Sequence, residues 1–364
     1  MIVPVLKYLY YKLLSKFRTP FPIRENSVLL IEFKSFHGET LPGYIKYLLD
    51  LGYNVDVVLH KSKTTDIGYR NDHGLFSCFN ANSKVKIISL PTHDINLLTH
   101  SSILSNYKHI VVNTFDDKIE RRFFCFSTLS QLKPICVVHN PDIIDNHIKT
   151  TKMVSLVKMI SVNQNSPIIV NPHYFGEFTK KSKKGNAEGI TIFVALNSGG
   201  SRRNLNLLFN ACDNLYKKGI YNFLIKIIGK GVHIPECYHN NIHDFGFLDF
   251  QPMYKEINTS DFFMALIDQE NTEYTNKASG TYQISYGFLK PLVLHRQFSG
   301  VAGFSGKDSV LYNTNNDLAD SMETCIKMSN DDYCNMVDAL EKSQKDLYVM
   351  SLDNLRKAFN TAVN

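Results

Sequence analysis

The chain of 364 residues lacks several motifs that would each identify a class of protein. No strand-like segment leads into the Gly-X-Gly-X-X-Gly fingerprint of dinucleotide-binding enzymes, and the Walker lysine motif is absent. The Gly-X-Ser-X-Gly elbow of α/β-hydrolases is also missing. Neither His-Glu-X-X-His nor Cys-X-X-Cys occurs, which excludes the standard zinc patterns, and we expect no bound metal ion.

The N-terminal segment Met1–Arg24 has no acidic residue, although five of its residues are basic. Its apolar residues fall near helical spacing, but the segment is too short and too charged to span a bilayer, which needs about 20 apolar residues. It also lacks the small-residue cleavage site of a signal peptide. Two interpretations stay open: an interfacial helix on an anionic membrane surface, with its lysine stems along the lipid, or a helix packed on its own domain.

Positive charge is only mildly in excess, with a formal net charge of +6. The sequence has no aromatic RNA-binding box and no long arginine-rich tract, so nucleic acid is not an expected partner. A mild positive excess suits anionic ligands or an anionic membrane surface. The cysteines are odd in number and several lie in apolar runs, which indicates reduced thiols in a cytoplasmic protein. If the N-terminal segment binds lipid, we expect the protein to be peripheral at the inner face of the cell membrane.

The length suits two domains of roughly 150 residues each. In the first half, the apolar strand Val28–Phe33 is followed by a helical pattern at Leu41–Leu51 and by a strand at Tyr53–Leu59. This β-loop-α-β order predicts parallel strands joined by a right-handed crossover. Four more short apolar strands are expected, as in parallel sheets buried on both faces, at Val85–Leu90, His109–Asn113, Pro134–His139 and Ser166–Val170.

Between about residues 171 and 188 the composition changes, and the lysine-rich run Lys180–Gly185 predicts a flexible linker. After it, strands are expected at Gly189–Ala195, Phe223–Ile228, Asp244–Phe247, Asp261–Ile267, Pro291–Leu294 and Ser309–Tyr312. Helices are expected at Asn204–Lys218, Gln251–Thr259, Thr281–Phe288, Asp317–Met328 and Asp331–Leu347. The sequence therefore predicts an α/β fold with two Rossmann-like domains facing each other across a cleft, at residues 25–175 and 186–364.

The loop that follows the first strand of the second domain has features that suit an anion. In open parallel sheets, ligands bind at the carboxyl ends of strands. Gly199 and Gly200 let the backbone approach a ligand, and Arg202 and Arg203 can pair with phosphate oxygens. The helix that follows points its positive end at the same place. The alternative is a flexible turn with surface arginines.

A second anion-ready segment runs from Thr275 to Gln283. Lys277 offers a cation, Gly280 allows a sharp turn, and the backbone amides at the helix start would be unpaired donors. Thr281 could instead be only the N-cap of that helix. Two such loops in one domain fit a diphosphate better than either does alone.

Titratable side chains lie at two strand ends of the first domain. His37 and Glu39 follow the first strand, and His139 ends a later one. Groups of this kind can position or deprotonate a hydroxyl. A lone histidine is more often structural, so both interpretations stay open.

In this order, the features resemble the GT-B glycosyltransferases, in particular the glycogen-synthase-like group that builds bacterial surface polysaccharides. The Gly-Gly-Ser-Arg-Arg-Asn loop at 199–204 resembles that group's first donor loop. The stretch His243–Ile267 looks like the strand, helix and strand that pass the nucleobase, with Asp261 where the group often has Asp. The stretch Tyr286–Val293 is similar to its Gly-Lys-Pro-Val ending.

The resemblance implies roles for individual residues. Arg203 would match the phosphate-binding lysine, Gly280 and Thr281 would supply amides to the diphosphate, and His139 would match a histidine near the reacting sugar. The implied donor-binding residues are Gly199, Gly200, Arg202, Arg203, Phe247, Lys277, Ser279, Gly280, Thr281 and Gln283. The acceptor-binding residues would be Phe36, His37, Gly38 and Glu39, and the catalytic candidates are His37, Glu39 and His139.

Three positions depart from the group's pattern. Ser198 stands where the group usually has an arginine, and Asn276 and Ile284 stand where it has two glutamates. Gln283 is next to the second of these positions, and Glu270 or Glu273 would have to replace the first glutamate. The contacts to the donor sugar and the stereochemical outcome are therefore open.

The implied function is transfer of a sugar from a UDP- or GDP-sugar to a glycan or lipid-linked acceptor in polysaccharide biosynthesis, without a metal ion or a further cofactor. Two alternatives remain. A GT-B nucleotide-sugar epimerase would share the donor site, and a non-catalytic glycan-binding accessory subunit would account for the missing glutamates.

Overall fold

Two parallel sheets of six strands form the framework of the chain. The computed structural model describes residues 22–34, 38–60, 74–116, 119, 124, 127–139, 158–161, 168–182, 184–197, 203–275 and 279–360. Contacts divide the chain into unit 1, which is Met1–Tyr174 with Val349–Asn364, and unit 2, which is Phe175–Tyr348. The N-terminal segment predicted at Met1–Arg24 lies mostly outside the described residues.

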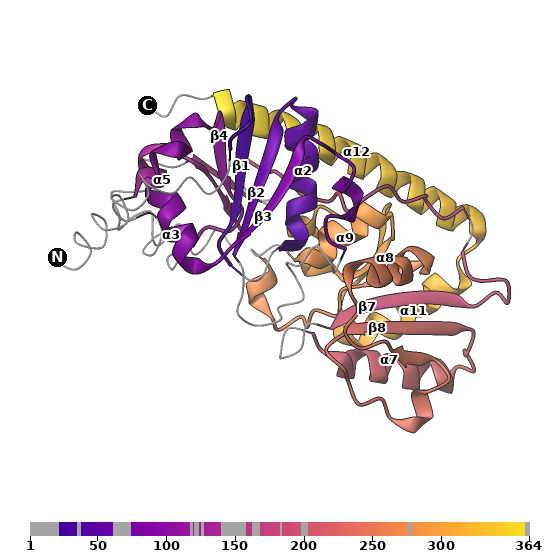
Figure 1. Ribbon diagram of the computed structural model, residues 1–364. Coiled ribbons are helices and arrows are strands. Elements are labelled where there is room, and N and C mark those ends of the chain that lie inside the picture. Colours follow the sequence, from indigo (N-terminus) through magenta and orange to yellow (C-terminus); the bar gives the residue numbers. More distant parts are fainter. Residues whose placement is uncertain are drawn as a thin grey trace. The chain divides into compact units, whose positions relative to one another are not determined.

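The sheet of unit 1 has the strand order β3-β2-β1-β4-β5-β6, and every pairing in it is parallel (Figure 1). All six residues of the central strand β1 are buried, as expected for a continuous apolar run covered on both faces. The strands are β1 (Ser27–Glu32), β2 (Asn54–His60), β3 (Val85–Leu90), β4 (His109–Val112), β5 (Ile135–Val138) and β6 (Lys158–Ser161). The order reverses between β1 and β4.

Helices α2 (Leu41–Asp50), α3 (Thr92–His100) and α5 (Thr128–Gln131) belong to unit 1, as does the end of the long helix α12 (Asn330–Asn360). Side chains of α12 hold it there. Asn354 Nδ2 donates to the carbonyl of Ile169 over 2.9 Å, and Ser351 Oγ accepts from the N–H of Asn171 at 3.0 Å. Phe359 stacks on His109 with ring centroids 4.0 Å apart. The second predicted domain ran to residue 364, whereas its last helix returns to unit 1.

Unit 2 repeats the same topology, with the order β12-β11-β10-β7-β8-β9 and only parallel pairings. Its strands are β7 (Thr191–Asn197), β8 (Phe223–Gly229), β9 (Ile242–Asp244), β10 (Phe262–Met264), β11 (Leu292–His295) and β12 (Ser309–Tyr312). Its helices include α7 (Leu205–Lys217), α8 (Phe250–Thr259), α9 (Gly280–Phe288), α10 (Ser299–Ala302) and α11 (Leu318–Lys327). The prediction of an α/β fold with two Rossmann-like sheets is confirmed.

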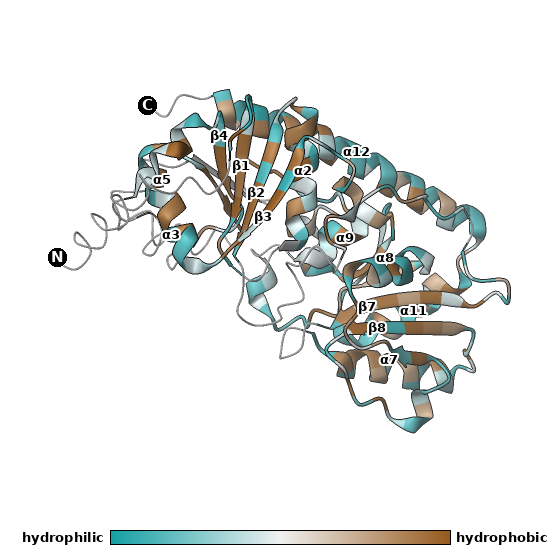
Figure 2. Cartoon of the chain, in the orientation of Figure 1, coloured by the Kyte–Doolittle hydropathy of each residue, from teal (hydrophilic) through white to brown (hydrophobic). Residues whose placement is uncertain are grey.

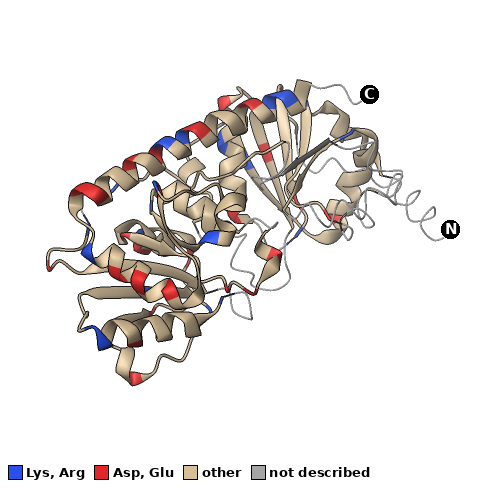
Figure 3. Ribbon diagram, turned by 180° about the vertical axis from the view of Figure 1, so that it is seen from behind, with Lys and Arg blue, Asp and Glu red and all other residues tan. Residues whose placement is uncertain are grey.

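The hydropathy of the elements follows this layering. In Figure 2 the strands of both sheets are mainly hydrophobic, whereas α12 carries many hydrophilic residues. Figure 3 shows basic and acidic residues alternating along α12. Some of them pair within the helix, as Lys345 does with Glu341 and Arg356 with Asp353. Exposed pairs of this kind contribute little to stability, so the buried side of the helix determines its position.

Several strand predictions were shifted or too long, three of them with consequences for the sheets. Within the predicted strand Ser166–Val170, the described residues form only a single bridge at Ile169, and the edge strand is β6. The strand predicted at Asp244–Phe247 is shifted, because β9 spans Ile242–Asp244 and ends at the residue where the prediction began. The strand predicted at Asp261–Ile267 is shorter because Leu266 adopts a left-handed conformation with φ of 48°, which ends the extended backbone.

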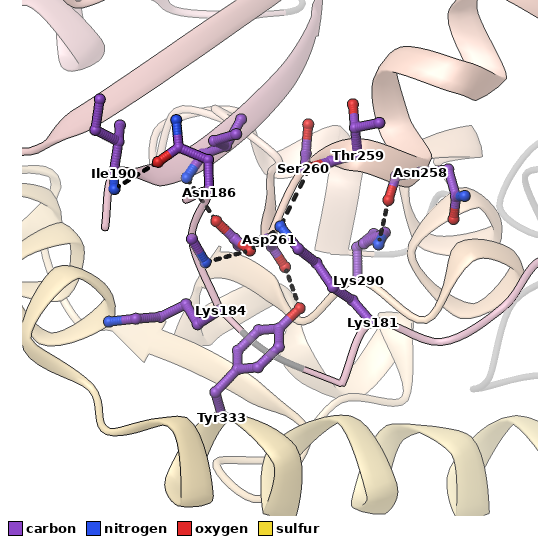
Figure 4. Close-up of polar contacts among 12 residues, drawn as sticks. Lys181, Lys184, Asn186, Ile190, Asn258, Thr259, Ser260, Asp261, Lys290 and Tyr333 are labelled. Atoms are coloured by element: carbon purple, nitrogen blue, oxygen red, sulfur yellow. Dashed lines mark hydrogen bonds and ion pairs between the residues drawn. The ribbon is translucent and has the colours of Figure 1, made fainter. Parts of the chain in front are cut away.

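The lysine-rich segment predicted as a flexible linker is anchored to unit 2 (Figure 4). Lys181 Nζ lies 2.5 Å from Oδ1 of the fully buried Asp261, and the N–H of Gly185 donates to the same oxygen over 2.9 Å. Oδ2 accepts from the N–H of Ile192, at 2.7 Å. Lys184 donates to the last carbonyls of α11. These contacts lie at the amino ends of the strands, so Asp261 stabilises the fold at the edge opposite to the expected ligand site.

Lys290 is a second buried charge at this edge, just before β11. Its side chain is fully buried, and Nζ donates to the carbonyl of Asn258 over 2.7 Å. The pKa of Lys290 is lowered from 10.5 to about 7, and burial is the largest cause. The nearby cations Lys181 and Lys226 also lower this pKa, whereas Asp261 raises it. The amine therefore releases its proton near neutral pH in the folded protein.

This lowered pKa predicts how stability depends on pH. Between the folded pKa of about 7 and the unfolded value of 10.5, the unfolded chain binds the extra proton, so stability rises with pH in that window. The rise is at most about 1.4 kcal/mol per pH unit. We expect Lys290→Met to remove this rise, measured as the urea unfolding free energy at several pH values across the window. Equal slopes in the two proteins would contradict the assignment.

Candidate donor and acceptor sites

In unit 2 the strand order reverses between β7 and β10, so the connections that leave these strands diverge at their carboxyl ends. Such a switch point is where open α/β sheets bind ligands. The described residues after the two strands meet there. The N–H of Asn204 donates to the carbonyl of Leu266 over 3.0 Å, and Asn204 Nδ2 donates to Asp268 Oδ2 over 2.6 Å.

Arg203 joins the two predicted anion loops. Its Nη2 donates to Ser279 Oγ over 2.9 Å and to Thr281 Oγ1 over 2.8 Å. Its guanidinium carbon lies 5.5 Å from the ring centroid of Tyr274, within cation–π range. The cation is therefore held against the first turn of α9, where the helix dipole is also positive.

The start of α9 differs in two ways from the prediction. The N-cap is Ser279, whose Oγ accepts from the N–H of Thr281, so Thr281 is not the cap. The N–H of Tyr282 donates to the carbonyl of Ser279 over 2.9 Å. The expectation of unpaired amides at the helix start was wrong for Thr281 and Tyr282, because both amides bond to Ser279. Arg203 is thus the main cationic donor that the structure describes at this place.

Several predicted donor residues are buried or lie outside the described residues. The side chains of Ser279, Thr281 and Gln283 are buried, and Gly280 is half-buried. The predicted contacts Gly199, Gly200, Arg202 and Lys277 are not among the described residues.

Asp268 organises this edge, although the prediction did not include it. It accepts from Asn204 Nδ2, from the N–H of Glu270 at 3.0 Å and from Asn315 Nδ2 at 3.1 Å. The backbone bond from Glu270, followed by the two amide side chains, holds its pKa below the usual value. Asp268 therefore ties the loop after β7 to the ends of β10 and β12. An acidic residue directly after a predicted strand was the available signal.

The carboxyl ends of β7 and β8 approach each other closely at Gly229. Its φ is 129°, and a Cβ there would lie 2.1 Å from the carbonyl oxygen of Asn197. The N–H of Lys230 donates to that oxygen over 2.7 Å. The N–H of Gly229 in turn donates to Gly246, next to Phe247, whose side chain is 64% exposed. An exposed aromatic face thus follows β9 at the same edge of the sheet.

We expect Gly229→Ala to destabilise the protein by about 1–3 kcal/mol, the cost of forcing a side chain into a packed site. Gly219→Ala is the matched control, since Gly219 also has a positive φ but no atom within 4 Å of an added Cβ. Urea unfolding of the two variants separates overlap from backbone strain. If Gly219→Ala is destabilised as much as Gly229→Ala, the positive φ alone accounts for the loss of stability, and overlap with Asn197 contributes nothing.

The equivalent switch point in unit 1 lies between β1 and β4 and contains the fully buried Glu32. Glu32 Oε2 accepts from Asn113 Nδ2 and from Thr114 Oγ1, both at 2.7 Å. Oε1 accepts from the N–H of Lys34 at 2.7 Å. The carboxylate therefore joins the residues that follow the two central strands.

Asn113 connects two of the predicted catalytic positions. Thr40 Oγ1 donates to Asn113 Oδ1 over 3.0 Å, which holds the short segment Gly38–Thr40 that contains Glu39. His139 Nε2 lies 3.0 Å from the carbonyl oxygen of Asn113. Asn113 thus bonds to His139 and to Thr40, the residue next to Glu39. The other predicted acceptor residues, Phe36 and His37, are outside the described residues.

Two general properties concern the described part of the chain only. Within it, no group of three or more His, Cys, Asp and Glu side chains is placed to hold a metal ion. Among its helices, none combines the length and the apolar composition needed to cross a membrane.

Comparison with known proteins gives the class of fold. No protein-family model matches the chain, and no curated protein matches its sequence. Among solved structures, the chain is similar to Anabaena HepE in complex with UDP and glucose, with a TM-score of 0.59 and 10% identity over 93% of this chain and 100% of that one.

Two further solved structures are similar over most of their length. One is WaaG, a glycosyltransferase involved in lipopolysaccharide biosynthesis, with a TM-score of 0.53 and 10% identity over 92% of this chain and 100% of that one. The other is a glycosyltransferase from Rickettsia africae, with a TM-score of 0.50 and 12% identity over 93% and 98% of the two chains. At these identities the similarity defines the fold, and the chain has the GT-B fold of these proteins.

Proposed function

We propose that the protein is a glycosyltransferase that moves a sugar from a nucleoside-diphosphate-sugar to a glycan or lipid-linked acceptor in polysaccharide biosynthesis. The observation that carries the proposal is Arg203, held by Ser279 and Thr281 against the first turn of α9 at the switch point of unit 2. A guanidinium and a helix N-terminus at one place form a site for phosphate oxygens.

Unit 2 is proposed to bind the donor. Its diphosphate would contact Arg203 and the start of α9, together with the glycine loop at 198–202 and Lys277. The exposed ring of Phe247 suits stacking on a base. The HepE structures contain UDP with glucose in one case and UDP-glucose in another, which supports a uridine nucleotide, with a guanosine nucleotide as the alternative.

The chemical step would depend on the leaving group. As the bond to the sugar breaks, negative charge develops on the diphosphate, and a fixed cation with a helix dipole stabilises it without reorganising. We propose that the reaction needs neither a metal ion nor a further cofactor. Transfer that is unchanged in the presence of a chelator would support this, and transfer restored only by a divalent cation would reject it.

Unit 1 is proposed to bind the acceptor at the carboxyl ends of β1, β4 and β5. Glu39 and His139, with His37, would position the acceptor hydroxyl or take its proton, and Phe36 and Gly38 would contact the acceptor. Asn113 bonds both to His139 and to Thr40, the residue next to Glu39, which supports one site for Glu39 and His139.

Arg203→Ala should weaken the binding of UDP or GDP by about 1.5–3 kcal/mol, the usual contribution of a hydrogen bond to a charged group. Titration calorimetry measures this directly. Arg356→Ala is the matched control, because Arg356 is exposed on α12 and pairs with Asp353. Equal affinity in Arg203→Ala and the unmodified protein would remove Arg203 from the donor site.

The activity is tested with radiolabelled nucleotide sugars and a lipid-linked acceptor. Label that moves to the acceptor supports the transferase. Isomerised sugar or released nucleotide without transfer would favour an epimerase or a hydrolase. Nucleotide that neither binds nor reacts would leave a glycan-binding accessory subunit.

We also propose that the N-terminal segment attaches the protein to the inner face of the cell membrane, on the basis of its basic residues Lys7, Lys12 and Lys16. Arg24 is not part of this surface, because it pairs with the buried Asp56 over 2.6 Å. Deleting residues 1–21 therefore removes the segment and keeps that pair. The truncated protein should no longer float with vesicles that contain anionic lipid, and unchanged flotation would reject the proposal.

A further inference from the structure

We infer that Glu32 is a positioning residue that fixes the ring of His139 through Asn113. The carboxylate and the imidazole are connected by the Asn113–Thr114 peptide, which follows β4. The effect on the reaction rests on the proposed function, whereas the effect on the ring can be measured without it.

The burial of Glu32 needs an explanation. A charged carboxylate buried in a sheet is costly unless hydrogen bonds compensate for the lost water. Glu32 is fully buried and accepts from Asn113, Thr114 and the N–H of Lys34. Hydrogen bonds to a charged acceptor are stronger than neutral ones, so they hold their donors in one geometry. An apolar residue would pack here but would orient nothing.

The donors that Glu32 holds are the two side chains on either side of one peptide bond. Asn113 Nδ2 and Thr114 Oγ1 bind the same oxygen of Glu32. The N–H of Asn113 donates to the carbonyl of Ile31 over 2.8 Å, and its Oδ1 accepts from Thr40 Oγ1. Both the nitrogen and the oxygen of the Asn113 side-chain amide therefore have partners. Because the N–H of Asn113 and the hydroxyl of Thr114 are bonded as well, the direction of the Asn113 backbone carbonyl is fixed.

That carbonyl determines the tautomer of His139. A carbonyl oxygen can only accept, so the ring nitrogen 3.0 Å away, Nε2, carries the hydrogen. In the neutral ring the lone pair is then on Nδ1. The hydrogen bond to the carbonyl thus makes Nδ1 the basic nitrogen of His139, and it fixes the plane of the ring.

A purely structural role for Glu32 is the alternative, and Asp56 provides the matched control. Asp56 is also a fully buried carboxylate in the same sheet, on β2. It pairs with Arg24 and accepts from Tyr107 Oη at 3.0 Å, so its bonds do not run through Asn113 or Thr114. Asp56→Asn should cost stability without changing the ring of His139.

The direct test is NMR of the full chain with ring nitrogen-15 labelled histidine, in which the His139 signals are assigned by their loss in His139→Gln. The unmodified protein should show the tautomer with hydrogen on Nε2. In Glu32→Gln the new NH2 group replaces one carboxylate oxygen and faces a group that is itself a donor, so a hydrogen bond is lost. The His139 signals should then shift towards mixed tautomers. Unchanged signals in Glu32→Gln, or equal changes in Asp56→Asn, would overturn the inference.

Thr114→Val is the second variant if Glu32→Gln does not fold. It removes one of the two bonds to Oε2 and keeps the shape of the side chain. A smaller change of the same kind in the His139 signals is expected, and no change would count against the inference.

A kinetic double-mutant cycle tests the consequence for the reaction. Glu32→Gln should lower kcat by about 10–100-fold, by analogy with the loss seen when the outer partner of a metal-binding histidine is removed. Nucleotide affinity should not change. In the His139→Ala background the same substitution should have no further effect, and additive effects would overturn the functional part. If no transfer occurs at all, the proposed function fails, and the tautomer experiment still decides the positioning.

Discussion

The reversal of strand order beside the first strand of each sheet is the constraint on which the sites depend. It makes the chain leave two neighbouring strands in opposite directions, so polar backbone and side-chain groups meet at the carboxyl edge. In each unit one carboxylate bonds to these groups. Asp268 binds the loops after β7 and β12, and Glu32 binds the residues after β1 and β4. A carboxylate thus joins the polar groups at the switch point of both sheets, from the end of β1 in unit 1 and from the segment after β10 in unit 2.

At the amino ends of the strands of the second sheet, the buried charged residues stabilise the fold. There Asp261 anchors the segment that enters unit 2, and Lys290 is buried near it with a pKa lowered to about 7. These groups bond to the backbone within the fold and do not lie at a switch point. Of the residues in the Gly-Lys-Pro-Val-like stretch, Lys290 therefore contributes to folding, whereas α9 presents its first turn to Arg203.

The sequence predicted the two Rossmann-like sheets because buried parallel strands produce continuous apolar runs, as in β1 and β7. It also assigned Arg203 and the start of α9 to one donor site; the structure joins these residues by direct bonds, and their role stays a prediction. It missed Glu32 because a single charged residue inside an apolar run was included in the strand. The strand predicted at Asp261–Ile267 was too long, since a left-handed Leu266 leaves no trace in the hydropathy pattern.

The carboxyl edge of the second sheet is the place where we expect a nucleoside diphosphate to bind. Hydrogen–deuterium exchange with and without UDP tests it for every segment at once. We expect slower exchange at residues 279–283 and 245–248. We expect no change at residues 185–192 on the amino edge, where Asp261 already holds the backbone. Protection confined to the amino edge, or none in unit 2, would contradict it.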